Sequence, residues 1–558
     1  MSARLTLVAT TDLHGQIRDV DYGTDAPYED AYGNRIGLAR VASVVRDIRA
    51  EAPYALLLDA GDLLEGSALA HHFSRRLGDA DAPLHPMAAV MNHLGYDAVA
   101  LGNHELDYGL RALERFREQL DAPLLAGNVR DATTGQRAFA GSVLRDVPVA
   151  EGASVRVGIV GLTTPTVTAW NRDVADHLRF DDVVPAAEPL VKELRAAGAE
   201  VVVVVVHSGI VEPPTRENAA VALARIVPGI DVVVAGHAHV EVAKRVERGP
   251  DGRRVLLTEP LCWGMRVARV ELDLALDRGR WTVAASRSRL VDTATAPEDP
   301  EVVALVAAQH ALVRARGAEV VGQTRVVIDP AQARYRPTDV LAMVARAQAA
   351  GARARVDGRV PLVSVVSPVS RCAPIPAGPV RRRDVAALCP FDSGVVVVAT
   401  DGRGLREHLE HAAAFFHRTT GPGPYDPDAL TNAPTPRTPL GTADFDYDVA
   451  YGVDAPLTYE IDLARPVGQR IVRLAYDGRP LADDQPLHVV VSRYRASGAA
   501  SYPGISAAPV VHEVAEPLRT LVERYIAAGR SYAAVPPHWR LVHDGVPVTF
   551  ATPGERGS

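Results

Sequence analysis

Residues 101–109, with the sequence LGNHELDYG, decide the fold class of the first half of this chain. They follow a short apolar run, 96–100, that predicts a buried strand, and they precede residues 110–120, which predict a helix. Asn103, His104 and Asp107 are therefore expected at the carboxyl end of a strand, where open α/β sheets place their chemistry.

Four further segments of the same kind occur before residue 240, and each follows an apolar run that predicts a strand. They are residues 11–15 (TDLHG), 59–62 (DAGD), 206–209 (VHSG) and 236–239 (GHAH). In an extended segment the side chains of residues i and i+2 point the same way. We therefore expect Asp12 with His14, and His237 with His239, each to reach one site.

Together these segments supply a set of candidate metal ligands. The set is Asp12, His14, Asp62, Asn103, His207, His237 and His239. It is too large for one catalytic ion and suits two, with Asp62 as the candidate bridge. The mixture of oxygen and nitrogen favours Mn²⁺, Zn²⁺, Co²⁺ or Fe²⁺ over Mg²⁺ or Ca²⁺. Any one histidine taken alone is better interpreted as structural, but all of them at strand ends favour a metal centre.

Length and charge limit the alternatives. A chain of 558 residues exceeds one ordinary core, so two or more domains are expected. A net charge of -8 provides no basic field for polymeric nucleic acid. Cys262, Cys372 and Cys389 are too far apart in sequence for a disulfide framework. Residues 1–4 lead directly into the first strand without an apolar signal segment, so the chain as given is expected to stay in the cytoplasm.

From residue 5 to about residue 290, strand-like runs alternate with helical patterns, which predicts a sheet covered by helices on both faces. The runs 255–259 and 267–276 lie close together in sequence and are expected to pair as antiparallel strands. Residues 292–300 are polar or small and contain prolines, which indicates a domain boundary. Residues 300–316 predict a helix.

The five segments, in this order and spacing, resemble the metallophosphatase signature D-x-H, G-D, G-N-H-E, H and G-H-x-H. The larger pattern is similar to the 5′-nucleotidase family, and within it to the bifunctional 2′,3′-cyclic-nucleotide 2′-phosphodiesterase/3′-nucleotidase branch. The resemblance is strong over residues 1–290. It continues more weakly to about residue 508, through residues 445–449 (FDYDV) and 492–496 (SRYRA).

This resemblance implies an α/β fold in two parts. It predicts a four-layer αββα calcineurin-like metallophosphatase domain over residues 1–292. A linker helix, rather than a part of the core, is expected over residues 293–319. A smaller α/β nucleoside-binding domain of the 5′-nucleotidase C-terminal type is expected over residues 320–558.

The resemblance also assigns roles to His104 and Asp107. In the family, the matching histidine stabilises the transition state or protonates the leaving oxygen, and an acidic residue three positions later orients it. An aspartate at that later position is typical of the 5′-nucleotidases rather than of the cyclic phosphodiesterases. A helix N-cap is the alternative role for Asp107.

For the C-terminal domain, the resemblance implies that two aromatic rings stack on the nucleoside base. Tyr494 aligns with one stacking position, and Phe391, Phe445 and Tyr447 are candidates for the other. Each of these residues could instead belong to the core, as most aromatic residues do. The segment after Tyr494 is similar to the cyclic phosphodiesterases and lacks the aspartate of the 5′-nucleotidases.

We therefore expect a two-metal hydrolase that opens 2′,3′-cyclic nucleotides at the 2′ ester and then removes the 3′ phosphate. A 5′-nucleotidase or UDP-sugar diphosphatase is the nearest alternative, and a non-catalytic nucleotide-binding protein is a remote one. The expected partner is a nucleotide or cyclic nucleotide, with no polymeric nucleic acid and no membrane, and the expected state is a monomer.

Overall fold

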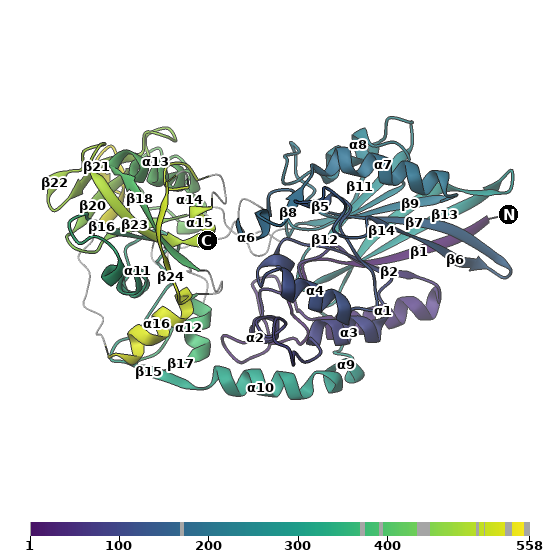
Figure 1. The fold of residues 1–558 in the computed structure, drawn as a ribbon, viewed down its shortest axis with the longest axis horizontal. Coiled ribbons are helices and arrows are strands. Elements are labelled where there is room, and N and C mark those ends of the chain that lie inside the picture. The colour runs from purple at the N-terminus through teal and green to yellow at the C-terminus, as the bar shows by residue number, and fades with distance from the viewer. Residues whose placement is uncertain are drawn as a thin grey trace. The chain divides into compact units, whose positions relative to one another are not determined.

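The structure is a computed structural model, and it describes residues 2–167, 172–368, 374–389, 394–431, 447–497, 502–506, 508–529 and 538–551. The chain forms two compact units (Figure 1), of which unit 1 runs to Arg314 and unit 2 begins at Ala315. This boundary falls within the range expected for the linker. No helix among the described residues is long and apolar enough to cross a membrane.

The first sheet of unit 1 has the strand order β14-β13-β1-β2-β3-β4. Its strands are β1 (Ser2–Thr10), β2 (Leu56–Asp59), β3 (Ala98–Ala100), β4 (Leu124–Leu125), β13 (Arg266–Asp277) and β14 (Arg280–Asp292). Strands β1 to β4 run parallel to one another, and β13 pairs antiparallel with both β1 and β14. The parallel strands therefore end at the same edge of the sheet.

The second sheet of unit 1 has the order β11-β12-β10-β9-β7-β6. Its strands are β6 (Ser142–Ala150), β7 (Ala153–Thr163), β9 (Val201–His207), β10 (Val232–Ala235), β11 (Glu241–Arg248) and β12 (Arg254–Pro260). The expected pairing of residues 255–259 with 267–276 is wrong, because β12 lies in this sheet and β13 in the other. Strand β12 is buried on both faces and pairs with β10 and β11, whereas β13 pairs with the first strand of the chain.

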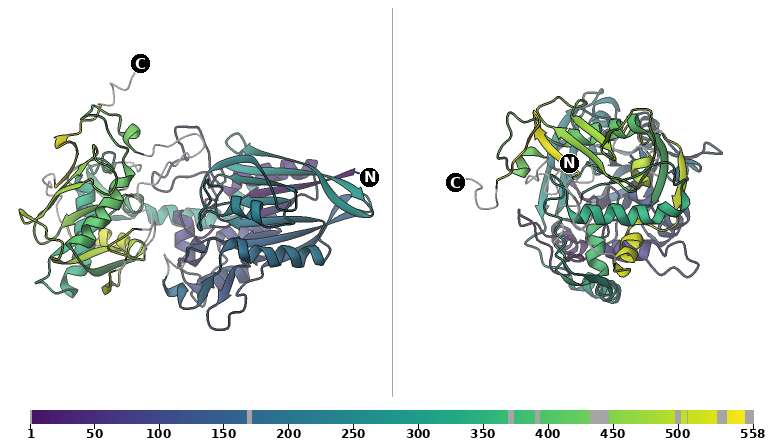
Figure 2. Two further views of the ribbon diagram at one scale, coloured as in Figure 1. Left: turned by 90° about the horizontal axis from the view of Figure 1, so that it is seen from above. Right: turned by 90° about the vertical axis from the view of Figure 1, so that its left-hand side faces the viewer.

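Helices cover the outer face of each sheet, which produces the four layers αββα (Figures 1 and 2). The helices are α1 (Leu38–Glu51), α2 (Ala68–Ser74), α3 (Pro86–Leu94), α4 (Leu110–Gln119), α6 (Arg172–Ala175), α7 (Val183–Ala196) and α8 (Ala220–Ile226), with the short helix η1 (His104–Leu106). Strand β1 shows the layering, since Leu5 and Leu7 pack between the sheets and Val8 packs against the helices. A small two-stranded sheet joins β5 (Val129–Asp131) to β8 (Leu178–Phe180).

The predicted helix over residues 300–316 is broken into α9 (Pro300–Leu305) and α10 (Ala307–Gly317). Its apolar stripe packs into the core of unit 1 through Val302, Val306 and Val313. Tyr22 also hydrogen-bonds His310 of α10, with 2.9 Å between the Tyr22 Oη and His310 Nδ1 atoms. Most of this segment therefore belongs to unit 1 rather than forming a separate linker.

Unit 2 is a smaller α/β unit. Its described residues form two five-stranded sheets, in the orders β19-β16-β23-β18-β24 and β22-β21-β20-β25-β26, and a two-stranded sheet β15-β17. The strands are β15 (Val320–Thr324), β16 (Leu362–Val366), β17 (Gly378–Arg381), β18 (Val395–Asp401), β19 (Val449–Gly452), β20 (Leu457–Asp462), β21 (Ile471–Tyr476), β22 (Arg479–Pro480), β23 (Pro486–Ser492), β24 (Val510–Val514), β25 (Trp539–His543) and β26 (Val546–Pro547). The helices are α11 (Asp339–Ala352), α12 (Arg382–Leu388), α13 (Gly402–Ala412), α14 (Pro427–Leu430), α15 (Arg493–Ala496) and α16 (Leu518–Ala527), with η2 (Arg353–Arg355) and η3 (Ala413–Phe415). One large apolar cluster joins the sheets and helices of this unit.

Candidate metal centre

The predicted ligands lie at the carboxyl ends of neighbouring parallel strands in both sheets of unit 1. Asp12 and His14 follow β1, Asp62 follows β2 and Asn103 follows β3, while His207 ends β9, and His237 and His239 follow β10. The strands β1, β2 and β3 are adjacent in the first sheet, and β9 and β10 are adjacent in the second. The two sheets therefore bring their ligand-bearing segments to one place.

The ligand segments are not extended, contrary to the sequence expectation. Asp12, His14, Asp62, His237 and His239 have φ angles of 50°, 47°, 65°, 81° and 52°. Positive φ is uncommon for residues other than glycine, and each such residue costs on the order of 1–3 kcal/mol. This backbone conformation persists because surrounding contacts determine it. The Asp12 N–H donates to Gly61 O at 2.9 Å, and the His14 N–H donates to Asp62 O at 2.8 Å.

Two glycines allow the segments after β2 and β3 to approach closely. A Cβ atom on Gly61 would lie 2.5 Å from the Gly102 nitrogen, and one on Gly102 would lie 2.2 Å from Asp62 Oδ1. Gly61 also has a φ angle of 98°. Any larger residue at either position would force the segments apart and move Asp62.

Asp12, His14 and His239 form the first ligand group, in which one ligand atom from each residue lies within 4.8 Å of the others. The His239 Nε2 atom is 3.2 Å from Asp12 Oδ1 and 3.1 Å from His14 Nε2. Lone-pair atoms of two imidazoles and a carboxylate thus converge, which is the arrangement that a divalent ion requires.

Asp62, His207 and His237 form the second group, again with one ligand atom each within 4.8 Å. Asn103 joins them, since its Oδ1 atom is 3.1 Å from His207 Nε2. His237 and His239 therefore belong to different groups, and the expectation that they reach one site together is wrong. Asp12 and His14 have the same left-handed backbone and yet share a group, so the separation comes from what each histidine contacts. His237 lies beside Glu217, whereas His239 lies beside Asp12 and His14.

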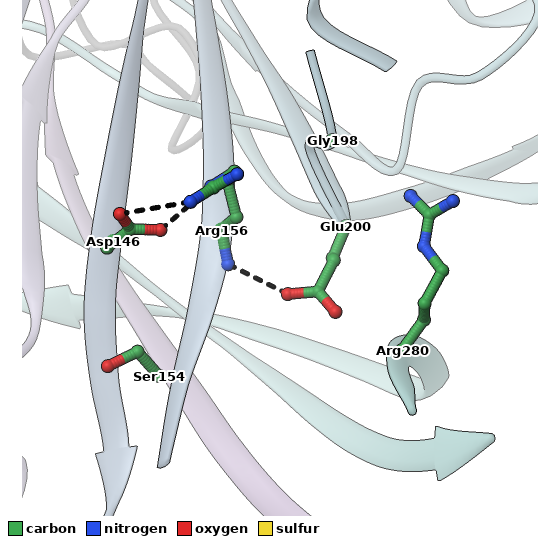
Figure 3. A pocket seen from close by; sticks show the side chains of 6 residues that line it. All are labelled: Asp146, Ser154, Arg156, Gly198, Glu200 and Arg280. Carbon is green, nitrogen blue, oxygen red and sulfur yellow. Dashed lines mark hydrogen bonds and ion pairs between the residues drawn. The ribbon is translucent and has the colours of Figure 1, made fainter. Parts of the chain in front are cut away.

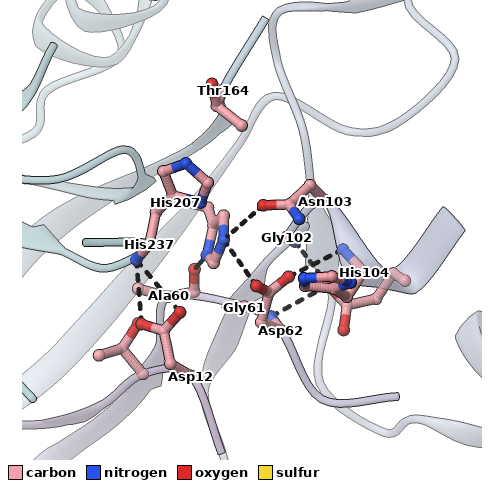
Figure 4. A network of polar contacts seen from close by, with 12 residues as sticks. Asp12, Ala60, Gly61, Asp62, Gly102, Asn103, His104, Thr164, His207 and His237 are labelled. Atoms are coloured by element: carbon pink, nitrogen blue, oxygen red, sulfur yellow. Dashed lines mark hydrogen bonds and ion pairs between the residues drawn. The ribbon is translucent and has the colours of Figure 1, made fainter. Parts of the chain in front are cut away.

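Asp62 lies near a histidine of each group, and Figure 4 shows its contact with His207. Its Oδ2 atom is 3.1 Å from His207 Nε2 and 3.9 Å from His14 Nε2. One carboxylate oxygen therefore faces a histidine of each group. This is the geometry expected of a ligand shared by two ions.

The charges of the site are complementary to bound cations. Burial alone would raise the pKa of Asp62, but the neighbouring histidines lower it well below its ordinary value. Burial would likewise lower the pKa of His207, yet the Asp62 carboxylate raises it to about 10. The carboxylates thus stabilise positive charge at this position, which divalent ions would supply. The oxygen and nitrogen donors fit such ions.

His104 is held beside the metal centre by two contacts. Its Nδ1 atom is 2.6 Å from Asp107 Oδ2, and its main-chain N–H donates to Asp62 Oδ1 at 2.9 Å. Although burial opposes it, the charges of Asp107 and Asp62 raise the pKa of His104 well above its ordinary value. Asp107 is not a helix N-cap, because the N-cap of α4 is Gly109. The Asp107 carboxylate therefore orients the His104 ring.

Two buried glutamates that the sequence analysis did not assign also position the ligand segments. Glu105 accepts from the N–H groups of Asp62, at 3.1 Å, and Gly102, at 2.6 Å. Glu259 accepts from the N–H groups of Ile210, at 2.8 Å, and Ala238, at 3.2 Å. Glu105 lies inside the LGNHELDYG stretch, so the motif could have indicated its role. No sequence feature near Glu259 indicates the role of that residue.

The aromatic candidates of unit 2 occupy different environments. Tyr494 lies half-buried on α15, with the Arg495 guanidinium 5.7 Å from its ring centroid. Tyr447 is fully buried and stacks on Phe415 at 5.3 Å between ring centroids. It is therefore a core residue, which corrects its assignment as a candidate for base stacking. Phe391 and Phe445 lie outside the described residues.

A separate pocket of about 320 Å³ lies in unit 1 beside the amino-terminal end of β9 (Figure 3). Its lining is polar, and Arg156 donates to Asp146 at 2.9 Å and, through its main chain, to Glu200 at 3.0 Å. Glu200 and the ligand His207 stand at opposite ends of β9, roughly 20 Å apart at the usual rise of a strand. This pocket is therefore distinct from the metal centre.

The four-layer sandwich, with these ligand segments at its strand ends, defines a metallophosphatase. Residues 5–241 match the family model of calcineurin-like phosphoesterases, and residues 320–507 match that of the 5′-nucleotidase C-terminal domain. The chain belongs to the 5′-nucleotidase family of metallophosphatases and is a phosphoric ester hydrolase. Family membership implies divalent metal ions, and the described residues form two candidate sites for them.

Individual relatives match most of the chain. The trifunctional nucleotide phosphoesterase YfkN of Bacillus subtilis is 28% identical over 94% of this chain. The matched region makes up 38% of the length of YfkN. A 2′,3′-cyclic-nucleotide 2′-phosphodiesterase/3′-nucleotidase of Haemophilus influenzae is 28% identical over 99% of this chain and 90% of its own. The structure of a 5′-nucleotidase precursor from Thermus thermophilus has a TM-score of 0.67 and 23% identity, and it covers 97% of this chain and 99% of its own.

Proposed function

We propose that this chain opens 2′,3′-cyclic nucleotides at the 2′ ester and then removes the 3′ phosphate, using two divalent ions. The observation that carries the two-ion chemistry is the position of Asp62, whose Oδ2 atom faces a histidine of each ligand group. The choice of substrate is supported by the Haemophilus relative, which is named for both activities and matches 99% of this chain. The donor set favours Mn²⁺, Zn²⁺, Co²⁺ or Fe²⁺ as the resident ions.

When bound, two such ions would polarise the phosphoryl oxygens and activate a water as the nucleophile. The residues of the chain supply the remaining functions. His104 donates a proton to the leaving oxygen from Nε2, because Asp107 holds the proton on Nδ1. The hydrogen bond from the His104 main chain to Asp62 keeps this donor at a fixed place relative to the ligands.

One site can serve both reactions, because the cyclic diester and the 3′ monoester present the same phosphoryl group. Only the leaving oxygen differs, being the 2′ oxygen in the first reaction and the 3′ oxygen in the second. These two oxygens are on adjacent carbons of one ribose. A single donor such as His104 can therefore protonate either oxygen after a small shift of the sugar.

A 5′-nucleotidase or UDP-sugar diphosphatase is the second candidate. The observation that favours it is the His104–Asp107 pair, with 2.6 Å between the His104 Nδ1 and Asp107 Oδ2 atoms. The sequence resemblance associates an aspartate at this position with the 5′-nucleotidases. The metal centre would serve such substrates equally well.

One assay distinguishes these candidates. The metal-loaded protein would be given 2′,3′-cyclic AMP, 3′-AMP, 5′-AMP and UDP-glucose separately with Mn²⁺, and kcat/KM measured for each. We expect the first two substrates to be preferred. Preference for 5′-AMP or UDP-glucose would favour the second candidate, and no hydrolysis of any of the four would contradict both.

A further inference from the structure

Two of the ligand histidines are anchored by main-chain carbonyls. The His14 Nδ1–H donates to Glu65 O at 2.7 Å, and the His207 Nδ1–H donates to Ala60 O at 2.8 Å. In both residues Nε2 is consequently the ring atom that faces the other ligands. Substitution of a neighbouring side chain leaves these two anchors in place.

His237 is anchored differently. Its Nε2 atom, rather than its Nδ1 atom, is engaged, and lies 2.9 Å from Glu217 Oε1. A carboxylate can only accept in this contact, so Nε2 carries the proton and Nδ1 is the atom that can ligate an ion. The Glu217 side chain is 40% exposed, whereas the His237 side chain is 12% exposed. The anchor therefore lies at the solvent-facing rim of the centre.

The position of Glu217 is coupled to the segment that follows β9. The Ser208 hydroxyl donates to Glu217 O at 2.6 Å, and the Gly209 N–H donates to Asn218 Oδ1 at 3.1 Å. Ser208 is the residue next to His207, which belongs to the same ligand group as His237. Glu217 thus connects the segments of two histidines that belong to one group.

We propose that Glu217 is a positioning residue for one of the two ions. Its carboxylate holds His237 in the tautomer and ring orientation in which Nδ1 ligates the ion of the Asp62–His207–His237 group. A carboxylate on the second ring nitrogen also makes the imidazole a more basic ligand. The affinity for this ion can therefore change without any change in the ligands themselves. The proposal rests on the metal centre and not on the proposed substrate.

The test measures metal binding and uses no nucleotide, so its outcome is independent of the proposed function. Protein stripped with a chelator would be dialysed against graded Mn²⁺, and the bound metal measured by elemental analysis. In Glu217→Ala we expect one of two binding steps to weaken by about 10–100-fold, the usual cost of losing a partner that orients a ligand. Glu217→Gln, which keeps the shape without the charge, should lose less.

Glu212→Gln is the matched control, because Glu212 lies in the same segment but pairs with Arg225 and Arg245. It should bind both ions as the unmodified protein does. Equal weakening of both steps in Glu217→Ala, or of neither, would overturn the proposal. Thermal unfolding of the metal-free proteins reports whether each variant folds. If Glu217→Ala does not fold, the metal binding of Glu217→Gln tests the proposal instead.

Two double variants show which of the two metal-binding steps Glu217 affects. In His239→Ala the second ligand group remains, so adding Glu217→Ala should weaken the remaining binding step by the same factor. In His207→Ala the second group is already disrupted, so Glu217→Ala should change the remaining step little. An undiminished effect of Glu217→Ala in the His207→Ala background would show that Glu217 acts on the other ion or on the whole fold.

Discussion

Two buried carboxylates, Asp62 in unit 1 and Asp448 in unit 2, are neutralised in opposite ways. Asp62 lies beside histidines of both ligand groups, so its charge favours cations from solution. Asp448 is paired with the buried Arg495, with Nε donating to Oδ2 at 2.7 Å and Nη2 donating to Oδ1 at 3.1 Å. A buried carboxylate is thus stable with either a permanent internal cation or a bound metal.

The remaining partners of Asp448 complete an internal network. The Ser367 hydroxyl donates to Asp448 Oδ1 at 2.6 Å, and His408 Nε2 lies 2.7 Å from Asp448 Oδ2. The Arg495 guanidinium also lies 3.8 Å from the ring centroid of Tyr502. The charge of Asp448 is therefore paired within the protein. The comparison therefore separates a site that recruits ions from a cluster that stabilises the fold.

The largest effect is expected from replacing Asp62, the carboxylate whose charge favours bound cations. Asp62→Ala should remove the shared ligand and lower kcat/KM by more than the ~10⁴-fold that marks the upper range for a lost proton donor. Elemental analysis should show loss of bound metal, while the thermal transition of unit 2 is retained. Asp146→Ala, an aspartate of unit 1 remote from the centre, is the control. Full metal content in Asp62→Ala would contradict the assignment.

The next effect separates proton donation from ligation within the same centre. His104→Asn should leave both ions bound but lower kcat by about 10²–10⁴-fold, the usual range for a general acid. Asp107→Asn should cost less, about 10–100-fold, because Asp107 only orients the ring. If His104→Asn releases metal, His104 is a ligand and the proposed role is wrong.

Asp448→Asn tests the buried network that Asp448 forms with Arg495 and His408. Removing the charge takes away the carboxylate that pairs with the buried Arg495 guanidinium, so we expect a loss of about 3–5 kcal/mol in the unfolding free energy of unit 2, with metal content unchanged. Urea unfolding monitored by circular dichroism would measure it. A stability loss below 1 kcal/mol, or a loss of metal, would contradict the contrast between the two carboxylates.

The Asp448 carboxylate also leads to a prediction about how stability depends on pH. Burial alone would raise the pKa of Asp448, but Arg495 and His408 hold it well below its ordinary value. Its contribution to stability is therefore complete above the ordinary value of about 3.9 and is lost as pH falls below it. The stability advantage of the unmodified protein over Asp448→Asn should be constant from pH 7 to 5 and should shrink in more acidic solution.

The smallest effect concerns substrate binding by unit 2. Tyr494→Ala should cost roughly 1–3 kcal/mol of nucleoside binding, the usual value of base–aromatic stacking, and raise KM for 3′-AMP accordingly. Hydrolysis of bis-4-nitrophenyl phosphate, which has no base, should be unchanged. Tyr447→Leu is the contrasting variant, because this core residue should lower the unfolding temperature without a preference between the substrates. Equal losses on both substrates in Tyr494→Ala would make it a packing residue too.

The candidate metal ligands could be named from the sequence because their signal is local. Each occurs within a few residues of a strand end, and parallel strands of one sheet end at the same edge. The roles of the aromatic residues could not be predicted in this way. Tyr447 is buried because the rings of Phe415, Phe416 and Trp539 pack around it. Tyr494 is half-buried on the short helix α15, which follows β23. Nothing near either residue in the sequence distinguishes these environments.

The sequence by itself determined the α/β class, the order of the ligand segments and the candidate ligand residues, because these depend on short-range patterns of apolar and polar residues. Only the tertiary structure decided that β12 and β13 lie in different sheets and that His237 and His239 belong to different ligand groups. It also decided that Glu217 anchors His237. These features depend on contacts between segments distant in the chain and on left-handed backbone angles that those contacts impose. Such constraints leave no periodic trace in the sequence.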